Sequence, residues 1–477
     1  MKLQEFLKNK VILLFIIFII VYIIFFFSFK QHSDIWWDSA SYIGAGKYIF
    51  SYGEEGVFEP QKSILLPIIL GVLWKLNFNV ILVGKIFIFL ISLLSLVFLY
   101  LFSKELFNEK TAFLATLILS FNVLFFIFIF RLYTEMLSIC FILGSIFFML
   151  KSTKNKSYNY LFLSSLFAFL AFLSKYQNII LFGILNIYLI YETYKSKKVS
   201  SIILFNIFSF IIFLPFLHIN YLVYGNPFYL VEQSKSYFKE NLGTLYNLKA
   251  FPGIPRVLFK TTDLIYFKTI LFLFNVLIPF IFYGLYLIIK EKNYFKEKIF
   301  LIIFPTLIFF FFLEIFYLKQ DRYILLIFPF LSMLASYGIS NSENKKAFLV
   351  VGIYIFFSLL GVAVFFSNFS ETQYANFFIN PPINISCEKV ATSDPRVAIS
   401  EKVKKIVFPY EVFDETWSPK RKGSQILSQN PNCIFYFSCY EKRDEHIKRL
   451  NEINYSLEYS KDTGRCLYAI FISFKIK

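Results

Sequence analysis

The sequence carries little charge for its length. Asp, Glu, Lys and Arg together make up 17% of its 477 residues, whereas an ordinary soluble domain is about a quarter charged. Hydrophobic residues make up 57% of the chain and aromatic residues 22%. The apolar residues also come in blocks of about twenty, which is the length that spans a bilayer as a helix. This composition excludes an ordinary soluble domain and predicts a polytopic α-helical membrane protein.

Residues that bind metals are also scarce. The chain has three histidines and five cysteines, and His32, His218 and His446 are scattered along it. The polar C-terminal tail, residues 368–477, contains no Gly-rich phosphate loop and no metal-ligand spacing. Any divalent metal would have to be held by carboxylates, and the sequence offers no convincing cluster of them. We therefore predict no certain cofactor.

Positive charge is concentrated in short connectors. The formal net charge is +17, and the lysines cluster at 1–10, 151–157, 194–198, 290–298 and 344–346. This distribution is what the positive-inside rule predicts for cytoplasmic loops, and so little soluble surface lies nearby that nucleic-acid binding is not expected. The first apolar segment is too long for a signal peptide and lacks a cleavage site. We therefore expect an uncleaved first span with a cytoplasmic N-terminus.

The apolar blocks predict eleven membrane spans. We place them at 9–29, 80–102, 111–130, 133–150, 158–173, 177–193, 201–222, 265–289, 298–317, 323–339 and 347–367. An odd number puts the C-terminus outside, and every lysine connector then lies inside. The apolar stretch 63–76 is short and contains Pro67, so we expect a half-buried helix on the outer surface there.

The polar tail predicts a second domain. Residues 1–367 are expected to form the transmembrane part, and 368–477 a small extracytoplasmic α/β domain. Apolar and polar residues alternate at 432–440 and 465–476, which predicts two strands. Between them, the apolar residues of "KRDEHIKRLNEI" have helical spacing. Four of the five cysteines lie in this tail, namely Cys387, Cys433, Cys439 and Cys466. Disulfides and buried free thiols are both compatible with the sequence.

The ionisable residues that need an explanation lie mostly on the predicted outer face. The first outer loop, 30–79, opens with "SDIWWDSASY", in which Asp34 and Asp38 directly follow an apolar span. Charges this close to lipid are costly, which indicates a function. The turns "RLYTE" (131–135) and "SKYQ" (174–177), the loop 223–264 and "KQDRY" (319–323) lie on the same face.

The first outer loop resembles that of GT-C membrane glycosyltransferases, and within them the protein O-mannosyltransferase and aminoarabinose-transferase branch, which is glycosyltransferase family 39-like. In "DIWWDSASYIGAGKYIFSYG" and "FEPQKSILLP", Asp38, Tyr42 and Lys62 fill the branch's Asp, Tyr and basic places. Ser39 replaces the branch's Glu, so the resemblance carries no second carboxylate or metal role to that position.

Three later stretches are similar to this branch in the same order. "RLYTE" resembles its Arg-and-acid pair, and "LSKYQ" resembles its Thr-Lys-Gly turn with Tyr176 in place of Gly. "DRYILLIFPFL" resembles its Arg-Tyr-Leu-Leu-Pro segment, here with the single proline Pro329. The resemblance implies a GT-C-like fold of about 11 transmembrane helices. It also implies transfer of a sugar from a polyprenyl-phosphate donor, dolichyl or undecaprenyl, to a hydroxyl of a protein, lipid or glycan acceptor on the outer face, with inversion.

Such a transfer needs a base at the acceptor hydroxyl and cations around the departing phosphate. Asp38 is our candidate for the general base. The candidates for contacts to the donor phosphate or headgroup are Lys62, Arg131, Lys175, Arg322 and Tyr323. Tyr42 and Glu135 are candidates for binding or orienting the acceptor.

Each assignment has a structural alternative. Asp38 could cap the helix that follows it, and Asp34 reads as solvated loop. Arg131 and Glu135 are four residues apart and could form an ion pair on one helix face. Lysines and arginines at span ends can also extend to lipid headgroups, and paired tryptophans fit an interfacial aromatic belt.

Two other classes of function remain open. A transporter or flippase of a lipid-linked saccharide should carry polar groups at mid-membrane and repeated halves, but here the ionisable residues lie at span ends and no repeat is visible. A non-catalytic scaffold that displays the tail would leave the Asp–Tyr–Lys arrangement unexplained. The identity of the sugar depends on the shape of the pocket, which spacing does not fix.

Overall fold

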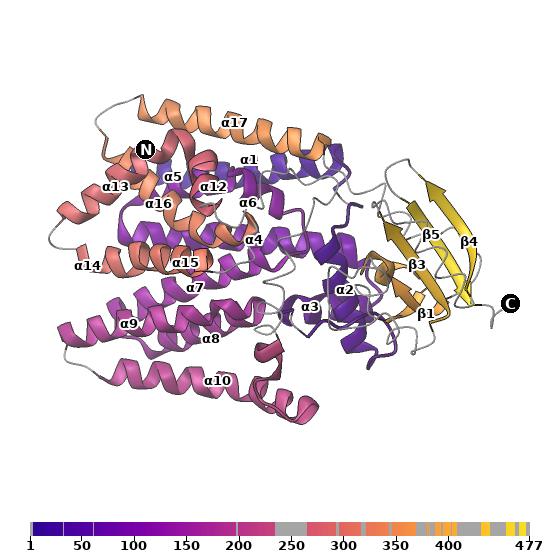
Figure 1. Ribbon diagram of the computed structural model, residues 1–477. Coiled ribbons are helices and arrows are strands. Elements are labelled where there is room, and N and C mark those ends of the chain that lie inside the picture. Colours follow the sequence, from indigo (N-terminus) through magenta and orange to yellow (C-terminus); the bar gives the residue numbers. More distant parts are fainter. Residues whose placement is uncertain are drawn as a thin grey trace.

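The computed structural model of the chain consists of a helical bundle with a small β-sheet at one end (Figure 1). It describes residues 3–31, 33–60, 62–196, 199–233, 265–291, 295–315, 321–342, 346–368, 379, 381, 387–392, 395–401, 403–407, 431–438, 455–462 and 467–473.

The first half of the bundle contains helices that range from one long span to a short turn of helix. They are α1 (Leu3–Ser28), α4 (Val80–Leu106), α5 (Glu109–Ser120), α6 (Val123–Phe128), α7 (Thr134–Asn155), α8 (Tyr158–Ser174), α9 (Ile180–Ser196) and α10 (Ser200–Tyr224). A short 3-10 turn, η1 (Tyr176–Ile179), precedes α9. The predicted span 111–130 is interrupted, because the side chain of Asn122 accepts hydrogen bonds from the first backbone N–H groups of α6.

The second half contains more irregular helices. They are α12 (Ile265–Phe274), η4 (Asn275–Leu277), α13 (Ile278–Lys290), α14 (Phe295–Lys298), η5 (Ile299–Ile303), α15 (Phe304–Ile315), η6 (Asp321–Ile327), α16 (Phe328–Ser340) and α17 (Ala347–Asn368). A proline lies in the first turn of both α13 and α16, where its missing N–H is tolerated.

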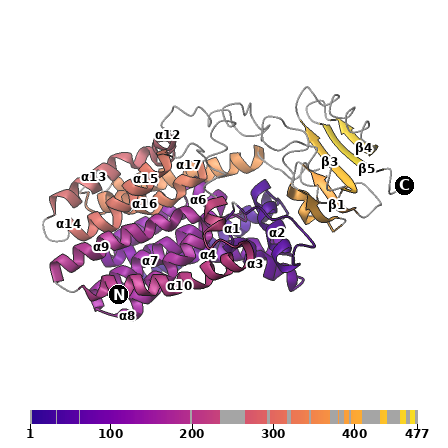
Figure 2. The ribbon, with the colours of Figure 1, turned by 60° about the horizontal axis from the view of Figure 1, so that its bottom comes forward.

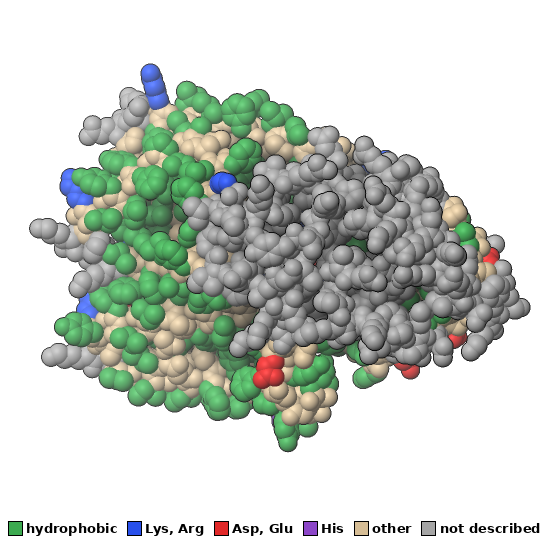
Figure 3. Space-filling model, viewed as in Figure 1, with side chains coloured by type: hydrophobic (Ala, Val, Ile, Leu, Met, Phe, Trp, Pro, Cys, Tyr) green, Lys and Arg blue, Asp and Glu red, His purple; other side chains and the backbone are tan. Residues whose placement is uncertain are grey.

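Each of the eleven predicted spans is helical over most of the residues that the structure describes, and 111–130 is broken at residues 121–122. Among the described residues, seven helices are long and apolar enough to cross a membrane by length and composition. Figure 3 shows that hydrophobic side chains dominate the visible side of the bundle, with Lys and Arg at the end away from the sheet. The prediction of a multi-pass membrane protein is therefore confirmed.

Two short helices lie at the end of the bundle that carries the sheet (Figure 2). They are α2 (Trp37–Phe50) and α3 (Leu65–Lys75). The helix expected at 63–76 is thus present, and it is half-buried and too short to cross a bilayer.

The sheet has five strands in the order β2-β1-β3-β5-β4. They are β1 (Cys387–Thr392), β2 (Val403–Val407), β3 (Cys433–Ser438), β4 (Tyr455–Asp462) and β5 (Leu467–Ser473). β1 pairs in parallel with β2 and β3, whereas β5 is antiparallel to β3 and β4. The strands predicted at 432–440 and 465–476 correspond to β3 and β5, and the helix predicted between them lies outside the described residues. A disulfide between Cys387 and Cys433 joins β1 to β3.

The sheet domain packs directly on the loop that follows α2. The backbone N–H of Gly56 donates to the carbonyl of Lys404, 2.8 Å away, and Val57 belongs to the core of the sheet domain. Gly56 has φ +76°, and a Cβ there would lie 2.2 Å from the carbonyl oxygen of Gly44. Only glycine fits this turn, which folds residues 57–64 back over α2.

Candidate active site

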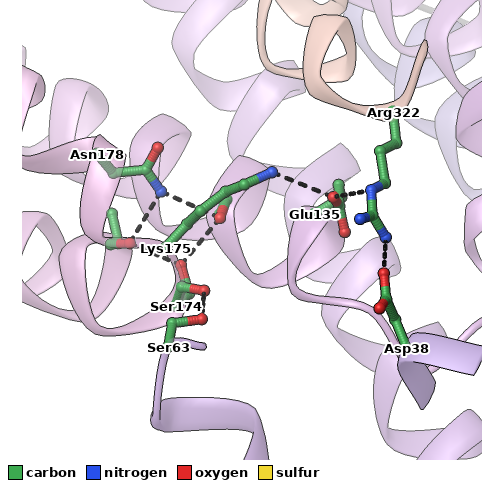
Figure 4. A network of polar contacts seen from close by, with 9 residues as sticks. Asp38, Ser63, Glu135, Ser174, Lys175, Asn178 and Arg322 are labelled. Atoms are coloured by element: carbon green, nitrogen blue, oxygen red, sulfur yellow. Dashed lines mark hydrogen bonds and ion pairs between the residues drawn. The ribbon is translucent and has the colours of Figure 1, made fainter. Parts of the chain in front are cut away.

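A network of buried ion pairs lies where α2, α7, α8 and η6 meet (Figure 4). Asp38 accepts a hydrogen bond from Nη1 of Arg322, and its other oxygen lies 3.2 Å from Nζ of Lys62. Its side chain is 20% exposed. Two residues that are 284 positions apart in the sequence therefore share one partly buried contact.

Glu135 continues this network on the far side of Arg322. Its Oε1 lies 3.1 Å from Nζ of Lys175 and 3.5 Å from Nε of Arg322. The Glu135 side chain is only 3% exposed. Arg322 thus bridges two carboxylates, and each carboxylate also has a lysine of its own.

Local sequence explains how each group reaches the network. Asp38 lies in the first turn of α2, where negative charge is favourable. The structure shows no side-chain capping bond at the start of α2, so Asp38 does not act as the helix cap that the sequence allowed. Glu135 likewise lies in the first turn of α7, and Lys175 directly follows α8.

A chain of neutral hydrogen bonds holds Lys175 and the loop next to it. Ser63 donates to the carbonyl of Ser174 at 2.6 Å, and Ser174 shares a hydrogen bond with Ser138 at 3.0 Å. Asn178 donates to Ser138 and to the carbonyl of Ala171. These contacts tie the loop 59–64 to the end of α8, and so they fix Lys62 and Lys175 relative to each other.

Two tyrosine rings lie against the two lysines of the network. The ring of Tyr42 lies 5.4 Å from Nζ of Lys62, and the ring of Tyr323 lies 4.0 Å from Nζ of Lys175. Rings at these distances attract the cation. Burial and the charge of Asp38 together raise the pKa of Tyr42, so Tyr42 is a neutral hydroxyl near neutral pH.

One further member of the network, Glu59, was not predicted from the sequence. Glu59 is 3% exposed, and its Oε2 lies 3.4 Å from Nζ of Lys62. Its signal in the sequence is its position three residues before Lys62. The site thus balances three carboxylates against three cations, namely Asp38, Glu59 and Glu135 against Lys62, Lys175 and Arg322.

Electrostatics keeps the central carboxylate ionised. Burial raises the pKa of Asp38, but the charges and hydrogen bonds of Arg322 and Lys62 outweigh burial and hold the pKa well below its usual value. Burial also lowers the pKa of Lys175, against the opposing charge of Glu135. A strongly paired Asp38 is a weak base, so its cations would have to move before it could accept a proton.

The structure places Arg131 apart from Asp38. Its guanidinium carbon lies 3.5 Å above the ring of Trp36 and 5.3 Å from that of Phe365. The expectation that Asp34 is solvated is wrong, because Asp34 is 2% exposed. Burial raises its pKa, and the charges of Lys85 and Arg131 oppose that rise. Lys85 is a buried cation that the sequence analysis did not single out.

Within the described part of the chain, no three His, Cys, Asp or Glu side chains are grouped so as to hold a metal ion. The carboxylates of the network instead have lysines and an arginine as partners.

Comparison with known proteins identifies the fold. Residues 61–219 match the family model of dolichyl-phosphate-mannose-protein mannosyltransferases. No curated protein matches the sequence significantly. The structure is similar to that of ArnT from Cupriavidus metallidurans bound to undecaprenyl phosphate, with a TM-score of 0.70 and 12% identity over 97% of this chain and 98% of that chain.

Archaeal structures show the same likeness. The apo oligosaccharyltransferase of Archaeoglobus fulgidus gives a TM-score of 0.59 at 11% identity, over 97% of this chain and 74% of that one. Archaeoglobus fulgidus AglB in complex with an inhibitory peptide and a dolichol-phosphate gives 0.59 at 9% identity with the same coverage. These findings confirm the resemblance to GT-C glycosyltransferases, and the chain has their membrane fold with a small C-terminal sheet domain.

Proposed function

We propose that the protein transfers a sugar from a polyprenyl-phosphate donor to a hydroxyl acceptor, with Asp38 as the general base. The observation that carries this proposal is the network in which Arg322 bridges Asp38 and Glu135. It combines a carboxylate with three cations at one end of the bundle. The match of residues 61–219 to a dolichyl-phosphate-mannose-dependent family and the undecaprenyl phosphate of the similar ArnT structure support a lipid-phosphate donor.

The chemical step is a single displacement. Asp38 accepts the proton of the acceptor hydroxyl while the acceptor oxygen attacks the anomeric carbon. The bond from that carbon to the phosphate oxygen breaks, and the polyprenyl phosphate leaves with the electron pair and one more negative charge. Attack from the face opposite the leaving group inverts the anomeric centre. Lys62, Lys175 and Arg322 stabilise the phosphate, because cations fixed in a water-poor site act most strongly on developing charge.

The same cations control the base. In the unliganded site Arg322 and Lys62 are occupied by Asp38. A donor phosphate competes for both, because an arginine or lysine pairs as readily with phosphate as with a carboxylate. As the cations turn toward the phosphate, Asp38 loses its partners and its pKa rises toward a useful range. The base is thereby activated when the donor is present. In this proposal Tyr42 orients the acceptor, and Glu135 orients Arg322.

We propose the following orientation. The disulfide between Cys387 and Cys433 is of the kind that persists in an oxidising, extracytoplasmic compartment. Lysines at the opposite end of the bundle, among them Lys104, Lys151 and Lys154, fit cytoplasmic connectors. The sheet and the charged network then lie outside, and the N-terminus lies in the cytoplasm. Accessibility of single engineered cysteines to an impermeant thiol reagent tests this orientation.

The experiment that tests the function uses purified protein in lipid. Polyprenyl-phosphate sugars carrying mannose, glucose or a pentose would be supplied with peptide, lipid and glycan acceptors, and the anomeric configuration of the product would be read by NMR. We expect transfer with inversion. Retention of configuration would contradict a single displacement. Movement of the lipid donor across the bilayer without transfer would favour the flippase alternative instead.

A further inference from the structure

A second buried cluster lies beside the active site and holds the segment that leads to Asp38. We call it the anchor cluster, and it consists of Gln31, Asp34, Trp36, Lys85 and Arg131. Lys85 reaches from α4 and donates hydrogen bonds to two main-chain carbonyl oxygens, those of Gln31 and Asp34. The Lys85 side chain is 2% exposed. A lysine this deeply buried is costly unless its ammonium group is well bonded.

Trp36 links this anchor to the start of α2. Its indole N–H donates to Oδ2 of Asp34 at 3.0 Å, and its ring contacts both the guanidinium of Arg131 and the ring of Phe365. Trp36 is also the N-cap residue of α2, and its carbonyl accepts a hydrogen bond from the N–H of Ala40 at 3.0 Å. The orientation of the first helical turn, and with it that of Asp38, therefore depends on Trp36.

The bonds of Lys85 go to the backbone, which indicates what the lysine does. An apolar residue at this position of α4 would serve packing without the cost of burying a charge. The ammonium group instead fixes two points, 31 and 34, of the short segment between the end of α1 and the start of α2. Asp38 lies four residues beyond the second point, in the first turn of α2, and must meet both Arg322 and Lys62.

We propose that Lys85 is a positioning residue, which through the carbonyls of Gln31 and Asp34 sets the carboxylate of Asp38 for reaction. This inference rests on the proposed function, in which Asp38 is the base. Reaction rates fall steeply with misplacement of reacting groups, by about 100-fold for roughly 1 Å. Lys85 should therefore affect turnover without touching donor or acceptor.

The test compares Lys85→Met with a matched variant of the same helix. Methionine keeps the length and burial of the side chain but cannot donate to the two carbonyls. The control is Ser92→Ala, because Ser92 is fully buried in α4 and bonds only within its own helix, to the carbonyl of Ile88. Lys85→Arg retains donors and should restore part of the activity. Trp36→Phe keeps an aromatic ring but removes the indole donor, and it serves as a second variant should Lys85→Met fail to fold.

Kinetics separates positioning from a general loss of structure. We expect Lys85→Met to lower kcat by roughly 10- to 100-fold, with the Kd for polyprenyl phosphate within about twofold of the native value. Combined with Asp38→Asn, it should add no further loss, because both changes act on the same group. Activity equal to that of Ser92→Ala would overturn the proposal. The proposal would also be overturned if Lys85→Met lowered kcat by the same factor in the native protein and in the Asp38→Asn variant.

Amide hydrogen exchange gives a readout that does not need turnover. Lys85→Met should speed exchange over residues 33–40 relative to Ser92→Ala, while exchange in α7 stays unchanged. Faster exchange in a protein that transfers no sugar would support the anchor and refute the proposed function. Transfer by the native protein with unchanged exchange and unchanged kcat in Lys85→Met and Trp36→Phe would refute the anchor alone.

Discussion

Arg322 should be the most sensitive cation of the site, because it contacts two carboxylates at once. Its Nη1 bonds Asp38 and its Nε lies 3.5 Å from Glu135. Arg322→Met would leave each carboxylate with a single lysine, Lys62 or Lys175. Removing one partner of a buried pair costs about 3–5 kcal/mol. We expect the lower end of that range, because the Asp38 side chain is 20% exposed and a cation remains beside each acid.

The effect on transfer should be larger than the effect on folding. Loss of one preorganised donor to a developing negative charge costs about 2.7–4 kcal/mol, or roughly 100- to 1,000-fold in rate. Arg322→Lys keeps the charge but cannot reach both carboxylates, so we expect an intermediate loss of about tenfold, or about 1.4 kcal/mol. The assay is transfer of radiolabelled sugar by protein in nanodiscs at saturating acceptor, with donor concentration varied.

The matched control is Lys298→Met. Lys298 is also buried and paired, with Glu291, but it lies at the end of the bundle away from the sheet. The Lys298→Met substitution should lower thermal stability and leave kcat unchanged. Equal kcat/KM for Arg322→Met and Lys298→Met, at equal amounts of folded protein, would refute the role of Arg322 as a phosphate contact.

Three further predictions follow from the same contacts. Glu135→Gln removes the charge that pairs with Lys175 and with one side of Arg322. We therefore expect kcat to fall about tenfold, with the Kd for polyprenyl phosphate unchanged or lower. A higher Kd, measured by calorimetry, would contradict an orienting role for Glu135. In the free protein, Arg322 and Lys62 overcome the effect of burial and hold the pKa of Asp38 well below its usual value, so kcat/KM should keep its value down to about pH 4. The acid limb of the kcat profile should lie at higher pH, because the donor phosphate draws those cations away from Asp38. Acid limbs of kcat and kcat/KM at the same pH would exclude the movement of the cations from Asp38 to the phosphate. Replacing the Cys387–Cys433 disulfide by two serines should destabilise the sheet domain by about 2–5 kcal/mol without changing the melting of the bundle, and a single shared shift of both transitions in calorimetry would show that the two parts unfold together.

The helices were accessible from the sequence because their signal is local. A block of about twenty apolar residues indicates a span wherever it occurs, and each of the eleven blocks is mainly helical where the structure describes it. The strands were harder to find. β4, "YSLEYSKD", lies at the edge of the sheet, and its alternation of apolar and polar residues is short. Tyr455 is buried but Leu457 is 41% exposed, and the register shifts between Leu457 and Tyr459. Strands β1 and β2 pair in parallel across a connection, which no local pattern records.

The site was predicted as a set of residues on one face, and resemblance supplied most of its members. Spacing alone could not pair Asp38 with Arg322, which is 284 residues away. It also could not distinguish Asp34 from Asp38, two carboxylates four residues apart. The two carboxylates differ in their tertiary contacts. Lys85 and Trp36 pack around Asp34, whereas Arg322 and Lys62 form ion pairs with Asp38.

The most direct measurement of the central claim compares Asp38→Asn with Glu105→Gln. Glu105 is a partly buried carboxylate with two lysine partners, Lys151 and Lys154, so it matches the electrostatic setting of Asp38 in a part of the molecule remote from the site. Both variants would be assayed for transfer from a radiolabelled polyprenyl-phosphate sugar and for donor binding. We predict that Asp38→Asn binds donor but loses at least about 100-fold in turnover, whereas Glu105→Gln turns over like the native protein. Equal turnover in the two variants would contradict Asp38 as the base.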